Sequence, residues 1–214
     1  MTPQAVITEV RRLLLDETEP YRYSDTFLLG LVNQGLKRMA VLRPDLFAAV
    51  GTVTCDEDAV VQSAPADSIR LIEVYSVVGG NAVTETNRET LDQNVPSWPA
   101  DTQGAAVNWM RNVRNPNKFY IYPKAPAGQV LSVEYAQTPS DYALGDTVLL
   151  LPGAYFPVVV DVTMFLAESV DNEHVTSGRA KMFQDSFTQA LGLSTQSRSI
   201  TDTETGGLDD KEVI

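Results

Sequence analysis

The stretch from Pro152 to Leu193 constrains the fold of this chain more than any other. Between Tyr155 and Ala167 the residues are almost all apolar, a density typical of a helix that is surrounded by protein on most sides. Many of them are β-branched, so a buried strand is the alternative, but a run of about fifteen residues is long for a strand. The run is also too short, and too closely flanked by acidic residues, to span a membrane.

A second helix is predicted after a polar elbow at residues 171–178. Its apolar residues recur at spacings that place them on one face of a helix: Ala180, Phe183, Phe187, Ala190 and Leu191. Gly192 is placed to cap the end of this helix.

Two further helices are predicted near the N-terminus. Thr2 and Pro3 provide a cap and a first-turn proline for the first, in which Arg11 and Arg12 are expected to face water. Ser24 is a good N-cap for the second.

The predicted fold class is α+β: a four-helix bundle with an inserted antiparallel β module and an extended C-terminal arm. The bundle is expected to use residues 3–16, 24–43, 153–171 and 177–192. Its core is expected to contain Phe27, Leu31, Val162, Phe165, Phe183 and Phe187. The corresponding domains are residues 1–47 with 151–193, residues 48–150 and residues 194–214.

The β module is predicted from short runs of β-branched and aromatic residues between turn signals. These runs are residues 51–55, 59–62, 69–78, 82–85, 106–111, 119–123 and 129–135. Gly79-Gly80-Asn81 is a hairpin signal, and Asn87 is a candidate cap for a helical turn. The segment from Pro96 to Ala106 has the composition of a loop.

The net charge of −12 and the pI near 4.4 argue against a protein that grips nucleic acid through its phosphates. They are compatible with a surface along which DNA passes without attachment. Cys55 is the single cysteine, which excludes an intramolecular disulfide and a cysteine-built metal site. The N-terminus does not have the basic-then-apolar layout of a signal peptide.

His174 is the single histidine and Asp171 lies close to it in the sequence, so a metal or acid–base site is one interpretation. A solvated elbow between two helices is the favoured one, because no second histidine and no distant carboxylate motif supports the pair. Cys55 alternates with Val53 in a strand and is expected to be an ordinary buried thiol. No catalytic residue, metal or cofactor is therefore predicted.

A contact with a tail protein or a second subunit is predicted around Trp98, Trp109, Arg111 and Arg114. Large aromatic residues in proline loops often anchor interfaces, and Trp98 lies between Pro96 and Pro99. Local packing of the tryptophans is the alternative.

Several stretches in succession resemble the head-to-tail adaptor proteins of tailed bacteriophages. They are Arg22-Tyr23-Ser24-Asp25 with Val32-Asn33-Gln34-Gly35, Phe119-Tyr120-Ile121-Tyr122-Pro123 with Val133-Glu134-Tyr135, Leu151-Pro152 with Tyr155 and Asp171-Asn172-Glu173, and Arg179-Ala180 with Phe183, Phe187 and Leu191-Gly192. Their order and spacing cover most of residues 20–192. The first helix, the loop from Pro96 to Gly104 and the tail after Leu193 depart from the pattern.

The resemblance implies a structural, non-enzymatic subunit of the virion neck, made in the host cytoplasm. Such subunits form a closed ring of about twelve copies between the portal and a tail or nozzle protein, and DNA passes through the lumen during genome ejection without specific binding. No membrane is involved. The alternatives from other classes are a small binding module and a hydrolase or metal enzyme that uses His174 with Asp171.

The C-terminal arm, residues 194–214, is too polar to bury enough apolar surface to order itself. The resemblance implies that it clasps the portal. Ile200, Leu208 and Ile214 would fill apolar clefts, and Asp202, Glu204, Asp209 and Asp210 would meet basic residues.

Overall fold

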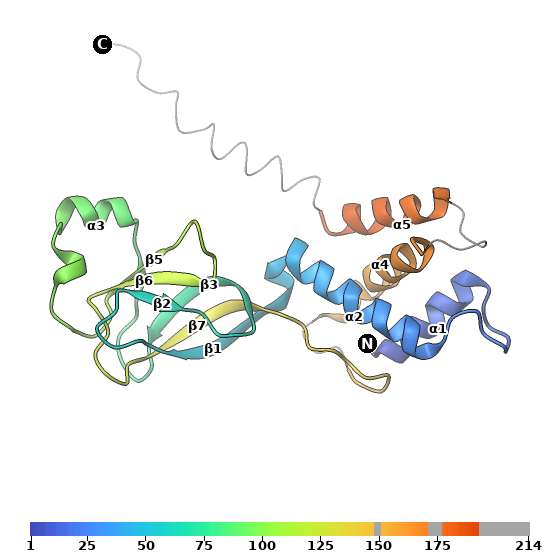
Figure 1. Cartoon of the computed structure of the whole chain (residues 1–214), viewed down its shortest axis with the longest axis horizontal. Helices are drawn as coiled ribbons and strands as arrows, with labels where there is room; N and C mark the ends of the chain where they lie inside the picture. Colours follow the sequence, from blue (N-terminus) through green and yellow to red (C-terminus); the bar gives the residue numbers. More distant parts are fainter. Residues whose placement is uncertain (148–150, 171–176, 193–214) are drawn as a thin grey trace, which may run out of the picture. The chain divides into compact units, whose positions relative to one another are not determined.

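The computed structural model describes residues 1–147, 151–170 and 177–192, which fall into two compact units. One unit is helical and contains residues 1–42 with the described residues from 140 onward. The other contains residues 43–139 and is built mainly of β-strands. Both units are drawn in Figure 1.

The helical unit is organised around α4 (Phe156–Glu168), which is preceded by the 3-10 turn η3 (Gly153–Tyr155). The helices α1 (Pro3–Leu14) and α2 (Asp25–Leu42) pack on each other and on α4, and α5 (Ser177–Ala190) packs on α4 (Figure 1). The apolar run therefore forms a helix and not a strand. The polar Thr163 within this run has a partner inside the helix, since its hydroxyl donates to the Val159 carbonyl at 2.7 Å.

Local signals place the helix ends. The Thr2 hydroxyl accepts a hydrogen bond from the Ala5 N–H at 3.2 Å and Pro3 occupies the first turn, as the sequence predicts. The Ser24 hydroxyl accepts from the Phe27 N–H at 3.2 Å in the same way. Leu15 ends α1 in a left-handed conformation at φ 55°.

The β unit begins with the 3-10 turn η1 (Pro44–Phe47) and contains two sheets. In the first, β7 (Val130–Gln137) lies between β1 (Ala48–Thr54) and β3 (Ser68–Val77), and both pairings are antiparallel. The second has the order β2-β6-β5-β4, with bounds Val61–Ser63, Lys118–Tyr122, Asn108–Arg111 and Thr84–Glu85. In this sheet β4 pairs with β5 in parallel, while the other pairings are antiparallel.

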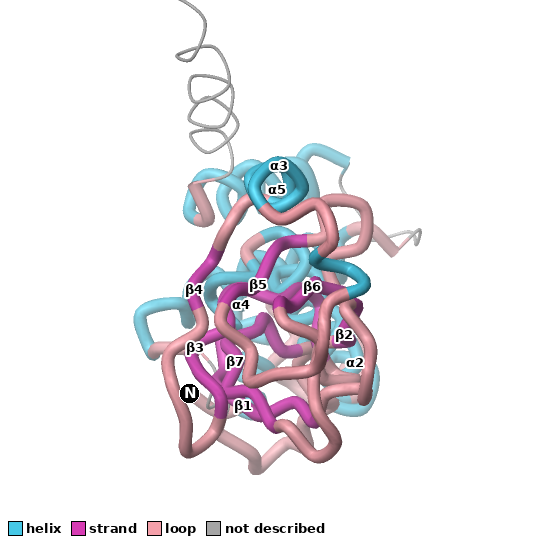
Figure 2. Tube along the Cα trace, turned by 90° about the vertical axis from the view of Figure 1, so that its left-hand side faces the viewer, coloured by secondary structure: helices cyan, strands magenta, loops and turns pink. Residues whose placement is uncertain are grey.

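The two sheets face each other across one apolar core. Trp109 from β5, Phe119 and Ile121 from β6, and Leu131 and Val133 from β7 are buried there. The opposite face of the second sheet is covered by α3 (Arg88–Asn94) and the 3-10 turn η2 (Trp98–Ala100), so the unit has three layers (Figure 2). Neighbouring residues of β6 thus enter different clusters, Phe119 the inter-sheet core and Tyr120 the cluster beneath α3.

The structure corrects the predicted fold class. It is a mixed α+β protein with five α-helices and seven strands in two sheets in the described part of the chain, and the four-helix bundle is wrong. The fifth helix, α3, belongs to the β unit because Leu91 and the nearby Trp98 pack on Met110 of the second sheet. The β unit is also not wholly antiparallel, because of the β4–β5 pair.

Two side-chain predictions in the helical unit were wrong as well. Phe27 is 37% exposed and is not a core residue, because its ring stacks on Tyr23 at the surface with centroids 5.2 Å apart. Arg11 is buried and does not face water, because its guanidinium pairs with the Asp16 and Asp25 carboxylates. Val162, Phe183 and Phe187 are buried, while Leu31 and Phe165 are partly buried.

Candidate functional site

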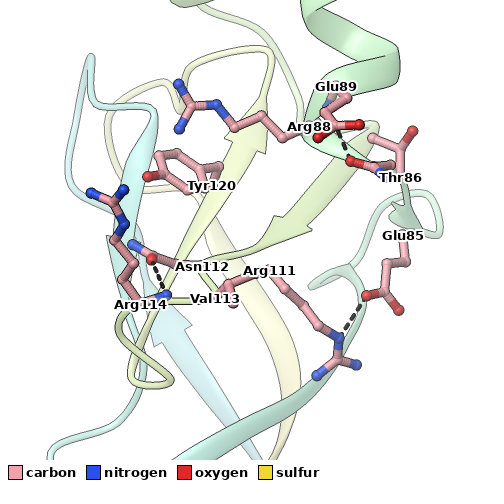
Figure 3. A pocket seen from close by; sticks show the side chains of 10 residues that line it. Glu85, Thr86, Arg88, Glu89, Arg111, Asn112, Val113, Arg114 and Tyr120 are labelled. Carbon is pink, nitrogen blue, oxygen red and sulfur yellow. Dashed lines mark hydrogen bonds and ion pairs between the residues drawn. The ribbon is translucent and has the colours of Figure 1, made fainter. Parts of the chain in front are cut away.

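A groove in the β unit is lined by residues from β4, α3 and the β5–β6 turn (Figure 3). Its volume is about 950 Å³. The lining residues are Glu85, Thr86, Asn87, Arg88, Glu89, Arg111, Asn112, Val113, Arg114 and Tyr120. Three arginines contribute to it, so it is called the arginine groove.

Arg88 is held at the start of α3 by the cap that the sequence predicts. The Asn87 side-chain oxygen accepts a hydrogen bond from the Glu89 N–H at 3.0 Å, which fixes the first turn of the helix. The Arg88 guanidinium then lies over the Tyr120 ring, 5.2 Å from its centroid, and 3.5 Å from an Asp92 oxygen. The positive charge of Arg88 is therefore partly compensated by the Asp92 carboxylate on the same helix.

Arg111 extends away from the other two arginines toward Glu85 (Figure 3). Its Nε lies 2.7 Å from the Glu85 carboxylate, and the same guanidinium donates to the Ile72 carbonyl and lies over the Trp109 ring. These contacts neutralise Arg111 and tie β5 to β4 and β3.

The turn between β5 and β6 is fixed by asparagine side chains. The Asn112 side-chain oxygen accepts hydrogen bonds from the N–H groups of Arg114 and Asn115, at 3.1 and 3.2 Å. The Asn117 side chain donates to the Ser68 carbonyl at 2.8 Å, which joins the turn to β3. This rigid turn carries Val113, which is 96% exposed, and Arg114. These two residues are called the β5–β6 tip.

The structure separates the four residues predicted as a tail or subunit contact. Arg111 and Arg114 line the arginine groove, whereas Trp98 and Trp109 are buried in two different clusters. The Trp98 indole donates to Asp92 at 2.6 Å, and the Trp109 indole nitrogen has no hydrogen-bond partner among the described residues. Both rings are used in packing within the unit, so a contact with a partner at this surface stays a prediction that rests on the arginines.

A second surface lies in the helical unit, at the segment between α1 and α2. It is organised by Arg11, whose Nη1 lies 2.9 Å from the Asp16 carboxylate and whose Nη2 lies 2.7 Å from the Asp25 carboxylate. The same Nη2 donates to the Tyr23 carbonyl at 2.8 Å. Asp16 in turn accepts from the N–H groups of Arg22 and Tyr23, at 2.7 and 3.2 Å. The network fixes the path of residues 16–25.

This rigid segment exposes apolar and acidic groups around a pocket of about 710 Å³. The pocket is lined by Glu19, Pro20, Tyr21, Arg22, Tyr23, Ser24, Phe27 and Val170. One face of the Tyr21 ring lies 3.9 Å from the Arg11 guanidinium, so the ring is held in place although it is 41% exposed. We call this pocket, which lies where the chain turns from α1 into α2 and is distinct from the predicted elbow at residues 171–178, the elbow pocket. Leu15 and Glu17 precede its lining residues in the chain.

Sequence reasoning missed the elbow pocket because it assigned Arg11 to the wet face of its helix. The signal that could have found it is the pair of aspartates around the turn, Asp16 just after the first helix and Asp25 at the start of the second. Both are placed to pair with a buried Arg11. The proposed pair of His174 and Asp171, and all the predicted residues of the C-terminal arm, lie outside the described residues.

No group of three or more histidine, cysteine or acidic side chains placed to hold a metal ion occurs in residues 1–147, 151–170 and 177–192. Over the same ranges no helix combines the length and the apolar character that crossing a membrane requires. Burial raises the pKa of the Cys55 thiol, which lowers its nucleophilicity at a given pH.

Comparison with known proteins identifies the family. The sequence model of the SU10 adaptor protein family, a family of phage head–tail adaptors, matches residues 1–207. The chain therefore belongs to this family, which confirms the resemblance found in the sequence. No curated protein matches the chain. Its role is accordingly that of a phage structural adaptor.

Proposed function

We propose that this chain is a ring-forming subunit of a phage neck that joins the portal to the tail and surrounds the exiting DNA. The family match over residues 1–207 carries the proposal. A closed ring needs two different, preformed surfaces on each copy, one for each neighbour. The β5–β6 tip and the elbow pocket are two such surfaces, because each is exposed and each is held by its own hydrogen-bond network.

The acidic charge of the chain supports a ring whose lumen surrounds DNA without binding it. The net charge is −12, and the chain has 28 acidic residues against 16 lysines and arginines. An acidic lumen would repel phosphates and let the duplex slide. The proposed role is mechanical and requires no catalytic residue, metal or cofactor.

Native mass spectrometry of the protein, alone and mixed with the portal protein of its phage, tests the ring. The expected result is one closed assembly of about twelve copies in at least one of the two conditions. A protein that stays monomeric in both would contradict the proposal. Retention of duplex DNA by the assembled protein at physiological salt would contradict the non-binding lumen.

The contact with the portal is assigned to residues 194–214. The basis is their composition: Ile200, Leu208 and Ile214 are separated by polar residues and by Asp202, Glu204, Asp209 and Asp210, a pattern suited to apolar clefts with basic rims. A variant that ends at Leu193 should fold but lose binding to immobilised portal. A matched variant that keeps every acidic residue but carries Ile200→Ser, Leu208→Ser and Ile214→Ser separates the apolar contribution from the charge. Unchanged portal affinity of the truncated protein would overturn this assignment.

A further inference from the structure

The β5–β6 tip is built to project an apolar side chain into its surroundings. Val113 is 96% exposed, although the turn that carries it is fixed by hydrogen bonds. The side-chain oxygens of Asn112 and Asn115 accept them from backbone N–H groups, and the Asn117 side chain donates to the Ser68 carbonyl. Two backbone bonds secure the base of the turn, because the Leu71 N–H donates to the Pro116 carbonyl at 3.0 Å and the Ala64 N–H to the Asn117 carbonyl at 2.8 Å. Because hydrogen bonds already hold the backbone of this turn, covering its valine costs less conformational entropy than covering one on a loop without such bonds.

The tip also carries an uncompensated positive charge. Arg114 is exposed and makes no ion pair with any residue that the structure describes, in contrast to Arg88 with Asp92 and Arg111 with Glu85. A partner for the tip should therefore combine an apolar pocket with acidic groups at its edge.

The elbow pocket has these two properties. Phe27 and Val170, which line it, are each 37% exposed, so the pocket presents apolar surface to water. Glu19 lines it and Glu17 lies two residues earlier in the chain. Both are exposed and form no ion pair within the described ranges, although the Glu17 charge contributes to raising the pKa of Arg12. The Arg22 guanidinium also lines the pocket, but it is directed to the Leu14 carbonyl, at 3.1 Å, and to the Tyr23 ring.

We propose that the β5–β6 tip of one copy inserts into the elbow pocket of a second copy of the same chain. Val113 would pack against Tyr21, Phe27 and Val170, and Arg114 would pair with Glu17 or Glu19. A volume of about 710 Å³ is ample for these two side chains. The contact deepens the proposed ring function and rests on it, because a tip and a pocket on every copy make a head-to-tail interface that repeats around a ring.

A second copy fits the two surfaces better than DNA does. Phosphates would be attracted by Arg114, but the exposed Val113 beside it offers them no interaction, and Glu19 would repel them from the elbow pocket. The tip brings a cation without an ion pair to carboxylates without an ion pair, and an exposed valine to an aromatic pocket. The two surfaces are therefore complementary in both charge and apolar character.

Charge reversal on either side tests the contact. One variant carries Arg114→Glu and the other carries Glu17→Arg with Glu19→Arg, so that each alone brings like charges together. Each variant alone should lose assembly at least about tenfold in native mass spectrometry, under the condition in which the wild type assembles. Mixed in equal amounts, the two should assemble again with a 1:1 composition, because each reversed tip then meets a reversed pocket.

Lys181→Glu on α5 is the matched control. It makes the same charge change at another exposed position and should leave assembly unchanged. Circular dichroism of each variant establishes that the fold is retained. Variants that assemble alone like the wild type, or a mixture of folded variants that fails to assemble, would overturn the proposed contact. In that case a wild type that still forms its ring leaves the neck function standing, whereas a monomeric wild type contradicts the ring itself.

Disulfide trapping provides a second measurement that does not depend on charge. A protein with Val113→Cys mixed with one carrying Phe27→Cys should give a cross-linked heterodimer on mild oxidation, with little background from the buried Cys55. Val113→Cys mixed with Lys181→Cys is the control and should give no more than trace product. Equal cross-linking in the two mixtures would count against insertion of the tip into the elbow pocket.

Discussion

Arg11 and Asp16 form an ion pair inside the helical unit, with 2.9 Å between Nη1 and Oδ2 and side-chain exposures of 9% and 6%. The pair is local in sequence, yet it joins the end of α1 to the segment that leads into α2. Its remaining hydrogen-bonding capacity is used by Asp25, the Tyr23 carbonyl and backbone N–H groups. A buried pair with this many partners fixes the geometry of the elbow pocket.

Removing one member of this pair should be costly. Arg11→Met is expected to lower the free energy of unfolding by about 3–5 kcal/mol, because it leaves the Asp16 carboxylate buried without its cation. The double variant with Asp16→Asn should lose less than the sum of the two single variants. Urea unfolding measures both. Arg12→Met, which alters an exposed pair with Glu9, should change stability little, and an equal loss in both arginine variants would contradict the buried network.

Two glycines of α2 should respond in opposite directions to alanine. A Cβ at Gly35 would lie 2.8 Å from the Val162 Cγ1, so Gly35→Ala forces α2 and α4 apart and should lower stability by about 1–3 kcal/mol. Gly30 has no atom within 4 Å of its Cβ position, so Gly30→Ala should raise stability by about 0.5–1 kcal/mol through helix propensity. Thermal unfolding of both variants measures these two changes in stability. If both variants were less stable than the wild type, α2 would have no free face at Gly30.

Phe187 should be an energetic anchor of α5. It is 5% exposed and its ring centroid lies 5.8 Å from that of Phe165 on α4. Phe187→Ala should lower the free energy of unfolding by about 3–5 kcal/mol. Phe27→Ala removes the same atoms from a site that is 37% exposed, and it should cost clearly less in stability. A larger loss at Phe27 than at Phe187 would contradict the packing of α5 on α4.

Cys55 should react slowly with thiol reagents in the folded protein. Burial raises the pKa of the thiol, so at any pH the folded chain holds less thiolate than the unfolded chain. The free energy of unfolding therefore does not depend on this thiol below its ordinary pKa. As pH rises above that pKa the protein loses stability, because unfolding then releases a proton from Cys55. Labelling rates with and without urea measure the difference, and Cys55→Ser should flatten the thiol part of the alkaline profile.

Local patterns predicted the elements of this chain well. Thr2, Ser24 and Asn87 act as helix caps in the structure, and each signal involves residues a few positions apart. Interfaces between elements were predicted poorly, since strand partners are set by contacts between distant residues. The strands at 118–122 and 130–137 follow each other in the chain but belong to different sheets. The signals around Phe27 and Arg11 were likewise too local to show that a phenylalanine lies at the surface and an arginine inside.

The ends of the β unit meet. Ala48 at the start of β1 is paired with Ala136, one residue before the end of β7, so the chain enters and leaves the unit on neighbouring strands. A segment with adjoining ends can be exchanged as one piece, because replacing it does not require the rest of the chain to take a new path. The β unit could therefore be exchanged as one piece between related chains while the helical unit keeps its sequence, provided that the β5–β6 tip is retained.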